Sequence, residues 1–289
     1  MFLGHYRRKT REWSIFINSM PSFLGLNAFQ WLALILAATT MLIAVDAVVG
    51  HYRHNFSYRL QFAPLISGPL LALTSLLTVI FPEAAGVRQA LTVGAWLAIV
   101  TGLIGFGFHS YYGILKKPGG LKWLLHYLMY GAPLLLPLAL SAMGWLALIV
   151  AAGLSKSLTV FGVDIPSMLI LFVVIVLTGS ILQAAILHYR GAFNTPAMYA
   201  PFTVPAVTVL TGIWMALDPS SWVRLTFAVL LWLTLLTGFI GFGMHLRGVD
   251  RQMGGLYVPL FNLMQGPPQG APGLFVGLAG VGLVAVYLL

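Results

Sequence analysis

The sequence contains no cysteine. This absence excludes disulfides, thiolate-held iron–sulfur clusters, covalently attached c-type haem and thiolate zinc sites. Charge is also scarce, because Asp, Glu, Lys and Arg make up 7% of the 289 residues, whereas a soluble domain carries about 25%. The six carboxylates include no pair placed for hydrolytic acid–base work. P-loop, H-E-x-x-H and G-x-S-x-G motifs are all missing.

Apolar residues dominate what is present, at 60% of the chain. A helix that crosses a bilayer needs roughly 20 mostly apolar residues, because lipid offers no partner for backbone N–H and C=O groups. Eight segments meet this requirement, at about 28–50, 63–81, 89–109, 132–153, 166–188, 200–217, 223–245 and 271–289. We therefore predict an all-α integral membrane protein with about eight transmembrane helices, placed in a bacterial inner (cytoplasmic) membrane.

The net charge of +9 is matched better by lipid headgroups than by nucleic acid. Loop arginines and lysines of a membrane protein meet anionic lipids at the bilayer surface, and no basic helix with interleaved aromatics indicates nucleic-acid binding. Residues 1–27 are interpreted as a basic N-terminal and interfacial segment. The dense basic cluster within it favours a cytoplasmic N-terminus. It consists of Arg7, Arg8, Lys9 and Arg11.

An internal duplication is visible in the sequence. Residues 101–109 read TGLIGFGFH and residues 237–245 read TGFIGFGMH, so seven of nine positions are identical. The triplet HYR at 51–53 returns at 188–190. These matches predict two four-helix repeats, residues 28–153 and 165–289. Four spans return the chain to the side on which it started, so the repeats are parallel and related by an axis along the membrane normal.

Four histidines occupy matched positions in the two halves. His51 and His188 end the first span of each half, and His109 and His245 end the third. All four are expected at one depth near the same membrane surface, which we call the histidine surface. The loops at 115–133 and 246–272, on the same side, are the longest in the chain, and such loops often cover a site or dock a partner.

Glycines precede the histidines of the third spans by four and seven residues, a spacing that puts them on the histidine's face of the helix. They are Gly102, Gly105, Gly238 and Gly241. A flat cofactor fits such a bare strip, and haem b is the candidate because it needs no cysteine and takes histidine as a ligand. Arg53 and Arg190, two residues beyond the first-span histidines, would pair with the propionates.

Several alternatives stay open at this stage. The histidines pair either within each half, giving two haems, or across the halves, and a compact cluster would instead bind copper, iron or zinc. Glycine strips also let membrane helices approach closely without any cofactor. Histidines at helix ends are often solvated or favoured by the helix dipole.

Asp46 is the only acidic residue well inside a span, and its counterpart in the second half is Gln183. Ionisable residues within a span are functional candidates by default. Proton handling and quinone contact are two interpretations of this pair. A hydrogen bond to a neighbouring helix is the third.

The leading functional hypothesis is a membrane electron-transfer subunit of an oxidoreductase complex. It would hold b-type haem near the histidine surface and exchange electrons with quinone or with a protein docked there. The first alternative is a cofactor-free anchor or scaffold subunit of a larger membrane complex. A small-solute transporter is the second, and it is disfavoured because few polar residues lie mid-membrane.

Overall fold

The computed structural model describes residue 22 and residues 24–288. Nearly all of the predicted N-terminal segment, residues 1–27, lies outside the described residues. Within them, eight helices are long and apolar enough to cross a membrane. They are α2 (Ala28–Tyr52), α3 (Ala63–Ile80), α4 (Ala85–Ser110), α6 (Leu136–Leu154), α7 (Ile165–Arg190), α8 (Ala200–Leu217), α9 (Ser221–Asp250) and α11 (Gly270–Leu288). The predicted all-α integral membrane protein with eight spans is confirmed.

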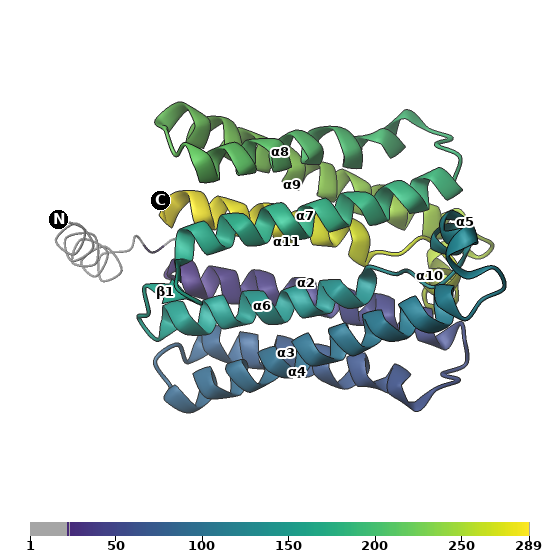
Figure 1. Cartoon of the computed structure of the whole chain (residues 1–289), viewed down its shortest axis with the longest axis horizontal. Coiled ribbons are helices and arrows are strands. Elements are labelled where there is room, and N and C mark those ends of the chain that lie inside the picture. The colour runs from purple at the N-terminus through teal and green to yellow at the C-terminus, as the bar shows by residue number, and fades with distance from the viewer. Residues whose placement is uncertain (1–21, 23, 289) are drawn as a thin grey trace.

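The long helices run side by side, and short elements lie at the two ends of the bundle (Figure 1). The histidine surface carries α5 (Leu124–Tyr130) and α10 (Pro259–Gln265). The opposite end carries a small antiparallel pair of strands, β1 (Thr159–Val160) and β2 (Val163–Asp164). Short η helices lie at the histidine surface too: η1 (Arg59–Phe62), η2 (Tyr111–Leu115), η3 (Gly120–Trp123), η4 (Pro196–Tyr199) and η5 (Gly255–Tyr257).

The helices pack as two rings of four. In the first ring α2 contacts α3, α3 contacts α4, α4 contacts α6, and α6 contacts α2. In the second ring α7, α8, α9 and α11 follow one another in the same way. Contacts of α2 with α11 and of α6 with α7 join the two rings. Consequently α2 and α4 lie diagonally across the first ring, and α7 and α9 lie diagonally across the second.

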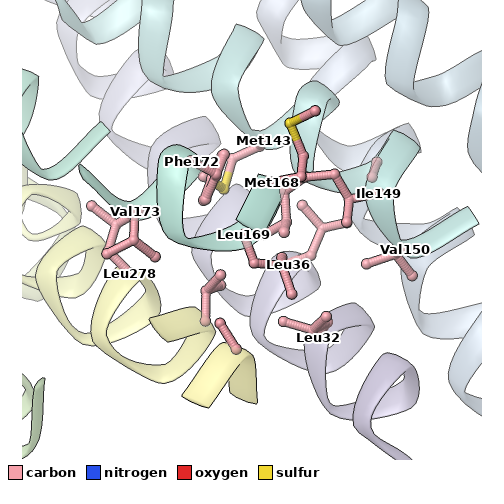
Figure 2. Packing of buried hydrophobic residues seen from close by; sticks show 14 of the residues in the cluster. Leu32, Leu36, Met143, Ile149, Val150, Met168, Leu169, Phe172, Val173 and Leu278 are labelled. Carbon is pink, nitrogen blue, oxygen red and sulfur yellow. The ribbon is translucent and has the colours of Figure 1, made fainter. Parts of the chain in front are cut away.

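The core lies where the central helices α2, α6, α7 and α11 meet (Figure 2). Leu36, Leu169 and Phe172 are fully buried there, and Phe172 meets Trp145 edge to face at 5.3 Å between ring centroids. Lipid is as apolar as these side chains, so close packing rather than water exclusion favours helix association. The outer helices instead expose large apolar side chains to the bilayer, as at Ile66 and Leu210.

Local sequence signals mark where several helices begin. Asn27 forms a capping box with Gln30 at the start of α2, which satisfies two otherwise unpaired groups. Asp164 accepts the Ser167 N–H at the start of α7, and Pro166 stands in its first turn. The span predicted from residue 132 begins later, at Leu136, because Gly131 to Leu135 form an irregular approach.

Backbone features recur at positions 137 residues apart. Asn55 and Phe56 have positive φ angles of 53° and 45° directly after α2, and Ala192 and Phe193 have 57° and 46° after α7. Such angles are uncommon for residues other than glycine. Phe56 then stacks on Phe62 at 4.6 Å, and Phe193 stacks on Tyr199 at 4.7 Å. The first and fifth spans thus end in the same strained turn.

Candidate functional site

The four histidines form two pairs, one in each ring of helices. His51 of α2 lies beside His109 of α4, with ring centroids 6.4 Å apart and ring planes at 88°. His188 of α7 lies beside His245 of α9, again at 6.4 Å and with planes at 81°. Each pair therefore joins the two diagonal helices of one ring at the histidine surface. Of the pairings left open by the sequence, the one within each half is observed.

Backbone carbonyls orient one imidazole of each pair. His109 Nδ1 lies 2.9 Å from the carbonyl oxygen of Pro133, and His245 Nδ1 lies 2.6 Å from that of Pro268. A carbonyl oxygen only accepts hydrogen bonds. Nδ1 of His109 and Nδ1 of His245 therefore carry the proton, and Nε2 of each imidazole presents a lone pair. Metal-binding histidines in proteins are held by this kind of hydrogen bond.

The other imidazole of each pair has an unsatisfied nitrogen. Nδ1 of His51 and Nδ1 of His188 are buried and have no hydrogen-bond partner within the described part of the chain. A buried polar atom without a partner costs about 1–3 kcal/mol. The same nitrogen thus lacks a partner among the described residues at both matched positions.

Aromatic rings lie beside the imidazoles of His51 and His188. The His51 ring lies 6.2 Å from Phe56, and the His188 ring lies 5.6 Å from Phe202. Phe193, the counterpart of Phe56, packs against Phe202 at 5.6 Å. These rings place apolar groups beside the half-buried His51 and His188.

The spacing of the rings suits a single metal between them. With metal–nitrogen bonds of about 2.0–2.1 Å, two imidazoles bound to opposite sides of one ion have centroids roughly 6.3 Å apart. No group of three or more His, Cys, Asp or Glu that could hold a metal ion occurs among residues 24–288. The compact cluster considered for copper, iron or zinc is therefore not formed by the described residues, and two imidazoles per half remain as residues that could hold a metal.

The glycines of the third spans lie against other helices. A Cβ placed on Gly105 would stand 3.0 Å from Pro137 Cβ of α6, and one on Gly102 would collide with Ser141. The matching residues of α9 meet α11 in the same way, and they are Gly238 and Gly241. In the structure these glycines permit close helix contact, and protein occupies the space beside them.

Arg53 and Arg190, the two arginines expected to pair with propionates, each contact a short helix of the other half. Arg53 donates from Nε to the carbonyl of Met264 and from Nη2 to the carbonyl of Gly266 at 3.1 Å, both at the end of α10. Arg190 lies over the ring of Tyr130, 5.7 Å from its centroid, at the end of α5. Arginine beside the last carbonyls of a helix is favourable, so these residues join the two halves at the histidine surface.

Asp46 and Gln183 make a second reciprocal connection, one step deeper in the membrane. Asp46 Oδ2 accepts the N–H of Gly270 at 2.9 Å, which is the first residue of α11. Gln183 Oε1 accepts the N–H of Leu135 at 3.2 Å, directly before α6. The hydrogen bond to a neighbouring helix is therefore the arrangement observed. Each side chain satisfies an unpaired N–H at the start of a helix in the other half.

The proline carbonyls that hold His109 and His245 were missed in the sequence analysis. A signal existed, because a proline follows these histidines by 24 and 23 residues in the two halves. The contacts of Arg53 and Asp46 with the second half leave no comparable trace, since their partners are backbone groups more than 200 residues away.

Fold and site together define an integral membrane protein with eight spans and two paired histidine positions at one surface. No family model, curated protein or solved structure matches the chain. Functional inference for this protein therefore rests on its own residues.

Proposed function

We propose that the chain consists of two parallel four-helix repeats, residues 28–153 and 165–289, and that each repeat holds one b-type haem between its paired histidines. The protein would then be an electron-transfer subunit of a bacterial inner-membrane complex. The observation that carries this proposal is the pair geometry, with centroids 6.4 Å apart in both halves. The partnerless Nδ1 atoms of His51 and His188 support it.

Haem b, when bound, supplies one-electron exchange at its iron. His51 with His109, and His188 with His245, would hold the iron of each haem. The carbonyls of Pro133 and Pro268 fix the orientation of the His109 and His245 imidazoles. Arg53 and Arg190, already at the histidine surface, would offer their remaining N–H donors to propionates by charge-assisted bonds. The glycines keep α4 and α9 close to their neighbouring helices.

The partner surface in this proposal is the histidine surface. Trp123, beside α5, and Tyr257, beside α10, expose 61% and 98% of their areas there. Exposed aromatics suit either the membrane–water interface or a docked protein. We assign this surface to a redox subunit, with quinone as the second exchange partner.

An absorbance spectrum tests the proposal most directly. The purified chain, expressed with haem precursor, should show a reduced-minus-oxidised haem b difference and bind about two haems per chain. His51→Ala and His188→Ala should each remove one haem, and the double variant should remove both. His54→Ala is the matched control, because His54 is exposed one turn along and its ring bonds only Gly50. Absence of haem absorbance in the wild-type protein would overturn the proposal.

A cofactor-free anchor subunit is the second candidate, favoured by one observation. The recurring glycines, arginines and Asp46 or Gln183 all have contacts within the polypeptide. Under this reading, alanine at the histidines weakens assembly with co-purifying subunits while the spectrum of the wild type is already blank. The two candidates therefore predict opposite spectra for the same preparation.

A further inference from the structure

A large apolar cavity lies between α6 and α7, the helices that join the two rings on one side. Its volume is about 710 Å³, which lies within the range of about 300–1,000 Å³ typical of small-molecule sites. Residues of α2, α4 and α11 complete its wall. Trp96, Leu171 and Ile175 at its margin are exposed at the outer surface of the bundle, so the cavity opens towards the bilayer.

The cavity has the dimensions of a lipid chain. Its lining follows α7 from Met168 to Gln183, a stretch that spans roughly 22 Å at about 1.5 Å per residue. Apart from Ser141, Ser180, Gln183 and the indole N–H groups of Trp96 and Trp145, its lining is apolar. This trough is suited to a long hydrocarbon tail, with the polar contacts confined to a few positions.

Among the serine and glutamine side chains of the lining, only Gln183 has hydrogen-bond donors to spare, beside the indole N–H groups of Trp96 and Trp145. The Ser141 hydroxyl donates to the carbonyl of Ile99 at 2.9 Å, and the Ser180 hydroxyl donates to that of Val176 at 2.8 Å. Gln183 uses Oε1 to accept the Leu135 N–H. Its Nε2 carries two donors, and neither has a partner among the described residues. A ligand in this cavity is therefore best recognised by an acceptor oxygen beside Gln183.

We propose that this cavity binds an isoprenoid quinone, with a ring carbonyl accepting from Gln183 Nε2 and the tail lying along α6 and α7 towards Met168. Binding needs only the cavity, whereas electron exchange at this site rests on the proposed function. Gln183 precedes His188 by five residues, so the head group lies roughly 7.5 Å along the α7 axis from that histidine. Asp46, the counterpart of Gln183, has no amide donor. The head group is therefore recognised by Gln183 of α7 and has no equivalent binding position beside Asp46 of α2.

Two variants remove the site without removing the fold. A Cβ on Gly179, in the cavity wall, would have no atom within 4 Å, so Gly179→Phe fills the trough instead of straining the packing. Gln183→Glu keeps an acceptor for the Leu135 N–H and in its ionised form has no donor; Asp46 already makes the equivalent bond through its carboxyl oxygen. Leu182→Phe is the control, because Leu182 is 55% exposed on the same helix and lies outside the cavity.

Quenching of tryptophan fluorescence measures the binding, since Trp96 and Trp145 line the cavity. The full chain in nanodiscs of phosphatidylcholine and phosphatidylglycerol is titrated with ubiquinone-10 or menaquinone-8. Saturable quenching is expected. Gly179→Phe should weaken binding about tenfold or more by steric exclusion, Gln183→Glu by about fivefold through the lost hydrogen bonds, and Leu182→Phe should match the wild type.

Phospholipid with brominated acyl chains separates a quinone site from a general acyl-chain site. If bromolipid quenches the tryptophan fluorescence and added quinone does not displace it, the inference is overturned. The same holds if quenching by quinone is linear with concentration and equal in all variants. The titration needs no haem, so quinone binding to a haem-free chain would support this inference while overturning the proposed function. Haem without quinone binding would do the reverse.

Discussion

The most informative single residues are the two polar side chains that join the halves within the membrane. Asp46→Leu should lower the thermal stability of the detergent-solubilised protein, because it leaves the Gly270 N–H buried without a partner, at a cost of about 1–3 kcal/mol. Asp46→Asn retains an acceptor and should restore most of that stability. A thermal scan of all three proteins checks this prediction, and an unchanged melting temperature for Asp46→Leu would contradict it.

Arg53 and Arg190 differ in the strength of contact that they make at matched positions. Arg53 donates to two carbonyls at the end of α10, whereas Arg190 makes an exposed contact with the Tyr130 ring, worth about 0.5–1 kcal/mol. Arg53→Ala should therefore increase proteolysis of the 251–258 loop more than Arg190→Ala increases proteolysis near α5. Limited proteolysis with sequencing of the fragments measures both, and equal sensitivity of the two loops would count against the difference.

At the scale of elements, Gly238 lies at a close contact of α9 with α11. A Cβ on Gly238 would meet Val276 Cγ2 at 2.7 Å and the Val276 backbone nitrogen at 2.9 Å. Gly238→Ala should destabilise the protein by about 1–3 kcal/mol through overpacking. Gly243→Ala in the same helix is the control, since its added Cβ has no atom within 4 Å. Equal melting temperatures for the two variants would show that α9 and α11 separate freely.

The helices themselves could be predicted because bilayer thickness imposes a length that composition alone reveals. All eight spans were found in this way, although α9 runs to Asp250, beyond the predicted end at residue 245. The side on which a helix packs could not be predicted, because nearly uniform apolar helices have no polar face to orient them. For that reason the sequence left both a cofactor and a neighbouring helix open for the strip of Gly102 and Gly105, and α6 covers it in the structure.

At the scale of the whole molecule, the reciprocal contacts hold the two rings together. Asp46 and Arg53 extend from the first half to the second, and Gln183 and Arg190 extend back. The matched positions of the four histidines followed from the duplication in the sequence. Which histidines lie together could not be predicted, because equal depth allows neighbours from either half. The packing of α2, α3, α4 and α6 into one four-helix ring brings His51 beside His109.

The absence of cysteine makes the orientation of the molecule directly measurable. The proposed parallel repeats would place Trp123 and Tyr257 on one side of the membrane, and the β1–β2 turn with Phe161, which is 70% exposed, on the other side. With a cytoplasmic N-terminus, a membrane-impermeant maleimide should label Trp123→Cys and Tyr257→Cys in intact cells. Phe161→Cys should react only after lysis, and the wild type, with no cysteine, supplies the blank. Labelling of Trp123→Cys and Tyr257→Cys from opposite sides would rule out parallel repeats, whereas the full pattern reversed would keep the repeats and turn the histidine surface to the cytoplasm.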